Sequence, residues 1–143
     1  MSLIAGMRSI NQRMALVIED STTRALHLQA LLEQVGLKVL LARGSQEGLQ
    51  IAQRARPDVV VLDLEMPKMS GSQICLWLKD MRETVSIPLI IFTRCDNYKV
   101  AALDIQLDAV DYIPKDAFAY RALLETLRSM DLIAPRTVDR YQS

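Results

Sequence analysis

The chain has few of the residues that build disulfide frameworks. Its 143 residues include two cysteines, one tryptophan and two phenylalanines. Cys75 and Cys95 do not form a CxxC pair, and no signal peptide is recognisable ahead of them. This usage is typical of reduced thiols, so we expect a cytoplasmic protein.

The chain also has no excess of charge and no long apolar run. Lysine plus arginine equals aspartate plus glutamate at 17 each, so no overall field would recruit nucleic acid or an anionic membrane. No apolar run approaches the length of a membrane span. Half of the residues are hydrophobic and 24% are charged, which is the ordinary balance of one globular domain.

Short apolar runs alternate with amphipathic segments along most of the chain. The runs predict strands over 14–18, 37–42, 59–63, 88–93 and 109–113. Apolar residues at three- and four-residue spacing predict helices over about 22–35, 45–56, 72–82 and 97–107, and through 120–127. Ser21 is the expected N-cap of the first helix, and Gly36 is expected to close it.

The order of these elements predicts the fold class and the domain bounds. Strands that alternate with helices form βαβ units, hence a doubly wound parallel sheet with helices on both faces. We expect this domain to cover residues 13–130. Residues 1–12 are expected to be a leader, part of which could derive from cloning, and 131–143 a polar tail or the start of a linker.

Polar residues follow the predicted strands where ligands of such sheets bind, beyond the carboxyl ends. Glu19 and Asp20 follow the first strand, Asp63 ends the third, Thr93 ends the fourth and Lys115 follows the fifth. Three carboxylates at one edge repel one another, and a divalent cation removes that repulsion. Oxygen ligands without a histidine or cysteine cluster favour Mg²⁺.

The remaining groups at this edge suit a phosphoryl group. The Lys115 ammonium and the Thr93 hydroxyl can each bind a phosphoryl oxygen. Asp63 is left as a nucleophile that could form an aspartyl-phosphate.

Four motifs at four strand ends closely resemble the receiver domain of two-component response regulators. They are Glu19-Asp20, Asp63 within VLDLEMPKMSG, Thr93, and Tyr112-Ile-Pro-Lys115, and the resemblance covers about residues 13–130. It implies a flavodoxin-like five-stranded parallel sheet of order 2-1-3-4-5 with five helices. It also implies Mg²⁺-dependent transfer of a phosphoryl group from a histidine kinase phosphohistidine to Asp63.

The same resemblance implies roles for individual residues. Asp20 and Asp63 would bind Mg²⁺ directly, Glu19 largely through water, and Glu65 through its backbone carbonyl. Phosphorylation would draw in the Thr93 hydroxyl.

Thr93 and Tyr112 would together form the switch. Inward rotation of Tyr112 would change the face made by helix 97–107, strand 109–113 and the last helix. Such a change is a two-state population shift.

The resemblance also implies partners. They are a sensor histidine kinase or phosphotransfer protein, and a downstream output domain or partner protein. The domain itself would bind neither nucleic acid nor membrane. It would not be an enzyme acting on other molecules, although it would catalyse its own phosphorylation and dephosphorylation. Dimerisation is common in the family, so a homodimer stays open.

The sequence departs from the usual pattern of the family at two places. A proline often follows the lysine of the family, whereas here Pro114 precedes Lys115 and Asp116 follows it. Arg94 replaces the small residue that usually follows the threonine. We expect Arg94 and the charged Glu65 to alter phosphodonor access and the lifetime of the aspartyl-phosphate.

Other functions stay open on the sequence alone. A pseudo-receiver would bind partners without phosphorylation. A phosphatase of the haloacid-dehalogenase type would need a second aspartate where Glu65 stands and a threonine or valine at Pro67. Taken singly, Asp63 could cap a turn, Glu19-Asp20 could cap a helix, and Tyr112 could serve packing only.

Overall fold

The computed structural model describes residues 12–63, 71–93, 110–114 and 118–135. They form a five-stranded parallel sheet of order β2-β1-β3-β4-β5. The strands are β1 (Met14–Ile18), β2 (Lys38–Ala42), β3 (Val59–Asp63), β4 (Leu89–Thr93) and β5 (Val110–Pro114). The order agrees with the sequence-based expectation.

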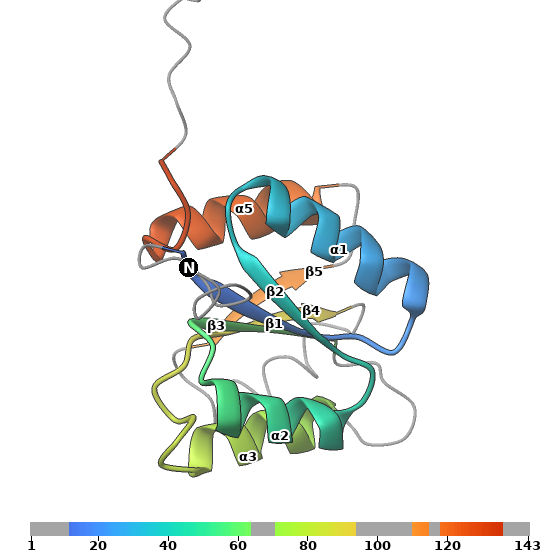
Figure 1. Ribbon diagram of the computed structural model, residues 1–143, viewed down its shortest axis with the longest axis vertical. Coiled ribbons are helices and arrows are strands. Elements are labelled where there is room, and N and C mark those ends of the chain that lie inside the picture. Colours follow the sequence, from blue (N-terminus) through green and yellow to red (C-terminus); the bar gives the residue numbers. More distant parts are fainter. Residues whose placement is uncertain (1–11, 64–70, 94–109, 115–117, 136–143) are drawn as a thin grey trace, which may run out of the picture.

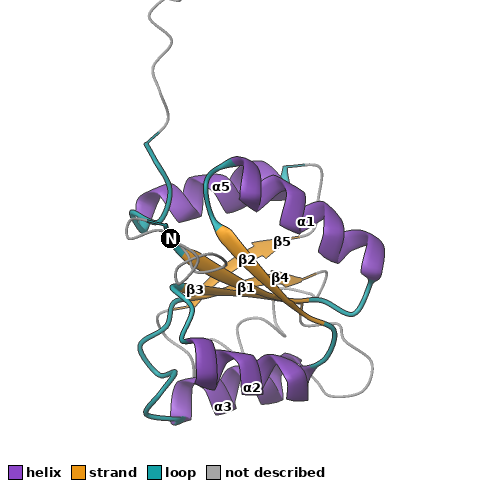
Figure 2. Ribbon diagram, viewed as in Figure 1, coloured by secondary structure: helices purple, strands orange, loops and turns teal. Residues whose placement is uncertain are grey.

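Helices cover both faces of the sheet. The described helices are α1 (Thr22–Gln34), α2 (Ser45–Ala55), α3 (Gly71–Asp80) and α5 (Ala119–Ser129). In Figure 1, α1 and α5 lie on one face of the sheet and α2 and α3 on the other. Figure 2 shows the same three layers by type of element. The helix predicted over 97–107 lies outside the described residues.

Local chemistry at both ends of α1 follows the prediction. The Ser21 hydroxyl accepts a hydrogen bond from the Arg24 amide at 3.3 Å, which satisfies one of the free donors at the start of the helix. Gly36 has a φ of 97°, and the Leu37 amide then donates back to the Leu32 carbonyl at 3.1 Å. A left-handed residue is favourable as glycine, which lacks a Cβ, so the helix ends here.

The two faces of the sheet carry two separate cores. Side chains alternate along a strand, so odd-numbered residues of β1 such as Ala15 and Val17 pack in the same cluster as Leu28 and Leu32 of α1. Even-numbered residues such as Leu16 belong to the other cluster, which includes four residues of α2 and α3: Ala52, Ile74, Cys75 and Leu78. The central strands are therefore buried on both faces, which explains why their sequences are continuously apolar.

Helix α2 packs against the carboxyl end of β1 through Gly48. A Cβ built at Gly48 would lie 2.5 Å from Cδ1 and 2.8 Å from Cγ1 of Ile18, whose side chain is fully buried. A larger residue would therefore force the Ile18 side chain, the helix or the strand to shift. Gly48 thus packs closely on Ile18, the last residue of β1, which directly precedes Glu19.

The fifth strand differs slightly from its prediction. It was expected over 109–113 and is observed over Val110–Pro114, where Pro114 pairs with Thr93. Proline has no amide hydrogen to donate, which is tolerated because β5 lies at the edge of the sheet. Lys115 directly follows Pro114 in the chain and lies outside the described residues.

The thiol of Cys75 is part of the core. The residue is fully buried in α3, and burial raises the pKa of its thiol to about 12. Its thiolate, which is the reactive form, is therefore scarce near neutral pH. Cys95 lies outside the described residues.

The described chain continues past α5 as far as residue 135. Leu132 and Ile133 are partly buried and pack against the core on the face of α1 and α5. Among the described residues, no helix is both long enough and apolar enough to span a membrane.

Candidate functional site

The strand register brings polar residues together at the carboxyl ends of the strands, which form the carboxyl edge of the sheet. Ile18 of β1 pairs with Leu62 of β3, so Glu19 and Asp63, which follow them, reach the same level on neighbouring strands. Asp63 in turn pairs with Phe92 of β4.

The register continues outward in the same way on the other side of β3. Thr93, one residue beyond Phe92, pairs with Pro114 of β5, which directly precedes Lys115 in the chain. Tyr112 pairs with Ile91, two residues deeper in the sheet. The backbone thus gathers Glu19, Asp63 and Thr93 at the carboxyl edge.

Glu19 is a buried acid with defined partners. Its side chain is 2% exposed, and its amide donates to the Ala42 carbonyl of β2 at 2.9 Å. Its Oε2 accepts hydrogen bonds from the Ser21 amide at 3.2 Å and from Nη2 of Arg24 at 3.1 Å. Burial of a carboxylate is costly without such partners, so these two donors offset part of that cost.

Asp20 is more accessible than Glu19 and shares the same cation. Its side chain is 33% exposed, and its Oδ1 lies 3.8 Å from Nη2 of Arg24. The two acids therefore differ in accessibility: Glu19 is buried next to the start of α1, whereas Asp20 is partly exposed.

Arg24 is a site residue that the sequence analysis did not identify. It lies in the first turn of α1, four residues after Asp20 and five after Glu19. The i, i+4 spacing from Asp20 is the signal that could have indicated it.

Part of the predicted site is placed by its backbone, and part lies outside the described residues. Asp63, Thr93 and Tyr112 are placed by the strands that contain them. Glu65, Arg94 and Lys115 fall in the segments 64–70, 94–109 and 115–117, outside the described residues, and so does the peptide bond between Lys115 and Asp116.

The described donors at this edge suit a hard cation. Within the described residues no three histidine, cysteine, aspartate or glutamate residues come together as a group that could hold a metal ion, and the acid pair supplies two carboxylates. An all-oxygen donor set fits Mg²⁺, which takes one or two protein carboxylates and keeps several waters. Asp20 is the more accessible member of the pair.

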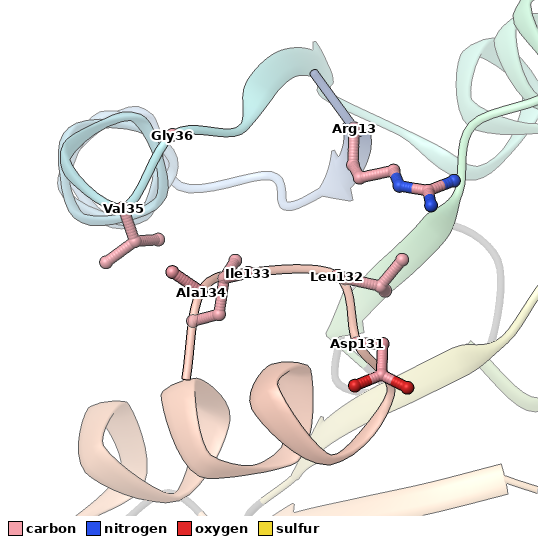
Figure 3. Close-up of a pocket in the computed structure, with 7 residues that line it drawn as sticks. All are labelled: Arg13, Val35, Gly36, Asp131, Leu132, Ile133 and Ala134. Atoms are coloured by element: carbon pink, nitrogen blue, oxygen red, sulfur yellow. The ribbon is translucent and has the colours of Figure 1, made fainter. Parts of the chain in front are cut away.

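A pocket of about 460 Å³ lies near the amino ends of the strands, opposite the carboxyl edge. Figure 3 shows its lining, which comes from the residue before β1, the end of α1 and the segment after α5. Nearby, the Asp58 carboxylate accepts a hydrogen bond from the Met14 amide at 2.7 Å and lies 3.8 Å from Nη1 of Arg13. This pocket is separate from the carboxyl edge, because Arg13 and Asp58 precede β1 and β3. The lining residues are Arg13, Val35, Gly36, Asp131, Leu132, Ile133 and Ala134.

Comparison with known proteins defines the class to which this fold and edge belong. The family model of the response regulator receiver domain matches residues 15–128, and the chain belongs to that family. Receiver domains are signalling modules rather than classical enzymes, they are phosphorylated on an aspartate, and they generally bind Mg²⁺. They interact with histidine kinases and output domains.

Individual relatives agree with this assignment. The chain is 34% identical over 115 residues to the protein PilH of Pseudomonas aeruginosa, covering 80% of this chain and 94% of PilH. It is 31% identical over 121 residues to the probable transcriptional regulator ycf27 of Cyanophora paradoxa, covering 85% of this chain and 49% of that protein. The chain thus spans most of PilH and about half the length of regulators such as ycf27.

The fold is also found among solved structures. The chemotaxis protein CheY4 of Vibrio cholerae, crystallised at low pH, superimposes with a TM-score of 0.75. The match covers 82% of this chain and 98% of CheY4, with 24% identical residues. At this identity the likeness concerns the fold.

Proposed function

We propose that this receiver domain accepts a phosphoryl group on Asp63 from the phosphohistidine of a histidine kinase or phosphotransfer protein. The observation that carries the proposal is the strand register, which brings Asp63 level with Glu19 and one residue from the level of Thr93. A carboxylate nucleophile at the end of a central strand lies at the edge where ligands of parallel sheets bind.

The proposed reaction is an in-line transfer to a carboxylate oxygen. An oxygen of Asp63 attacks phosphorus, the bond from phosphorus to the donor's histidine nitrogen breaks, and that nitrogen keeps the electron pair. Asp20 and Asp63 would hold Mg²⁺ directly, with Glu19 acting through water and Glu65 through its carbonyl. When bound, the cation supplies charge neutralisation for the acids and the phosphoryl oxygens.

The other strand ends would bind the transferred group. The Lys115 ammonium would pair with one phosphoryl oxygen, and the Thr93 hydroxyl would donate to another. Movement of Thr93 towards that oxygen would favour an inward position of Tyr112, two residues deeper than Thr93 in the register. The expected output surface is the face of segment 97–107, β5 and α5, and a difference of a few kcal/mol between its two states is enough for switching.

Further features follow from the same proposal. The complete domain would include a fifth helix over 97–107, giving the flavodoxin-like arrangement. Arg94 and Glu65 flank the proposed site in sequence and would tune phosphodonor access and aspartyl-phosphate lifetime. The protein would act in the cytoplasm, through an output domain or a partner protein, as a monomer or a homodimer.

Removal of the metal tests the proposed chemistry. With acetyl phosphate and Mg²⁺, intact-mass measurement should show one added phosphoryl group per chain, because the cation offsets the repulsion between Asp63 and the incoming group. Excess EDTA should reduce the phosphorylated fraction at least tenfold, and added Mg²⁺ should restore it. Equal phosphorylation with and without EDTA would contradict a metal-dependent transfer.

A further inference from the structure

We propose that Arg24 is a resident counter-ion that competes with the divalent cation for the acid pair, and so weakens metal binding in the unphosphorylated protein. This inference rests on the proposed function, because it concerns the same metal site. It adds a residue from α1 that tunes how readily the cation binds.

The contacts of Arg24 place its charge between the two acids. Its Nη2 lies 3.1 Å from Oε2 of Glu19 and 3.8 Å from Oδ1 of Asp20. A single guanidinium nitrogen thus reaches both carboxylates that would otherwise attract a metal ion. A cation that binds Asp20 must therefore approach a carboxylate whose Oδ1 already lies 3.8 Å from a guanidinium nitrogen.

The position of Arg24 in α1 supports this role independently. Arg24 lies in the first turn of the helix, where the helix dipole disfavours a positive charge, and that turn contains no acidic residue. The charge is compensated instead by the two acids that precede the helix. The guanidinium is thus stabilised at this point by the acid pair, and any cation that binds the pair acts against that stabilisation.

The different burial of Glu19 and Asp20 indicates which of their contacts with Arg24 breaks when a metal ion binds. Glu19 is 2% exposed, and its Oε2 is also bound by the Ser21 amide, so its contact with Arg24 is held in place. Asp20 is 33% exposed and makes the longer contact. We therefore expect Asp20 to turn from Arg24 to the metal, while Arg24 stays on Glu19. The repulsion between the retained guanidinium and the metal then lowers the affinity.

Direct measurement of metal binding tests this inference. Mn²⁺ bound to the unphosphorylated protein can be titrated by electron paramagnetic resonance, with Mg²⁺ added as competitor to obtain its affinity. Arg24→Gln should bind both cations about tenfold more tightly than wild type, because one positive charge near the metal is removed. Arg24→Lys keeps the charge and should stay within about twofold of wild type.

A matched control removes a similar ion pair elsewhere. Nη1 of Arg128 lies 3.0 Å from Oε1 of Glu125 on α5, so Arg128→Gln removes an arginine from a glutamate without touching the acid pair. Its metal affinity should equal that of wild type. An equal gain in Arg128→Gln and Arg24→Gln would overturn the inference, since it would reflect net charge alone.

A measurement on the wild-type chain covers the case in which Arg24→Gln does not fold. On titration with Mg²⁺, the side-chain Nε resonance of Arg24 should shift in a ¹⁵N spectrum, while that of Arg128 should stay fixed. Unchanged or weaker binding in a folded Arg24→Gln, an unshifted Arg24 resonance, or no Mn²⁺ binding by either protein would each overturn the inference.

The two proposals fail in different ways. Phosphorylation of wild type at saturating Mg²⁺ depends on Asp63 and would persist if Arg24 had no effect on affinity. Conversely, a chain that is never phosphorylated while Arg24→Gln still tightens Mn²⁺ binding would contradict the proposed function and leave the inference standing.

Discussion

Asp63→Asn should reduce incorporation of phosphate from acetyl phosphate or a kinase to background. The amide of asparagine is a poor nucleophile, and no other carboxylate is expected to occupy the position of Asp63 at the end of β3. The phosphate on wild type should be released by base and by hydroxylamine, as expected for an acyl phosphate. Intact mass measured before and after treatment with base or hydroxylamine shows both the incorporation of the phosphate and its release.

Asp58→Asn is the matched control for Asp63→Asn. Asp58 lies one residue before β3, at the opposite edge of the sheet, and its Oδ2 accepts a hydrogen bond from the Met14 amide at 2.7 Å. Phosphorylation should persist, because Asp58 lies away from the carboxyl ends of the strands. Asparagine can still accept this bond but lacks the charge, so the loss of stability should be about 1 kcal/mol. Hydroxylamine-sensitive phosphate on Asp63→Asn at the wild-type level would show that another residue is the acceptor.

Leu32→Ala should lower the free energy of unfolding by about 2 to 5 kcal/mol. Leu32 is fully buried, with an exposed fraction of 0%. It packs between α1 and the sheet, in the same cluster as Leu28 and Val17. Truncation removes the buried methyl groups and leaves a cavity. A domain has about 5 to 15 kcal/mol of total stability, so this substitution removes a large share of the free energy of unfolding.

Leu26→Ala is the control on the same helix. Leu26 is 54% exposed, so the same truncation removes little buried area, and we expect a change within about 0.5 kcal/mol. Urea unfolding followed by circular dichroism gives both values. Similar losses at Leu26 and Leu32 would contradict the assignment of which face of α1 packs on the sheet.

The strand order and the start of the first helix could be predicted because local signals fix them. Four-residue apolar runs such as Val59–Leu62 identify strands buried on both faces, and the alternation with helices requires parallel pairing. Ser21 and Gly36 have the side chain and the missing Cβ that the two ends of α1 need. These features depend on residues close together in sequence.

The role of Arg24 could not be predicted with the same ease. An arginine at i+4 from an aspartate is common on solvated helix surfaces, where such a pair contributes little. What distinguishes Arg24 is the burial of Glu19, which depends on the packing of α1, β1 and β2 around it. Likewise, the extension of β5 to Pro114 depends on its place at the sheet edge.

The most direct test of phosphorylation at Asp63 is an NMR titration with beryllofluoride and Mg²⁺. Together they mimic the phosphoryl group on an aspartate. We expect amide shifts at Asp63, Thr93 and Tyr112, and fixed amides at Arg13 and Asp131 beside the pocket at the other edge. Asp63→Asn should abolish the shifts. No shift in wild type, or the same shifts in Asp63→Asn, would contradict the account and favour a module that binds partners without phosphorylation.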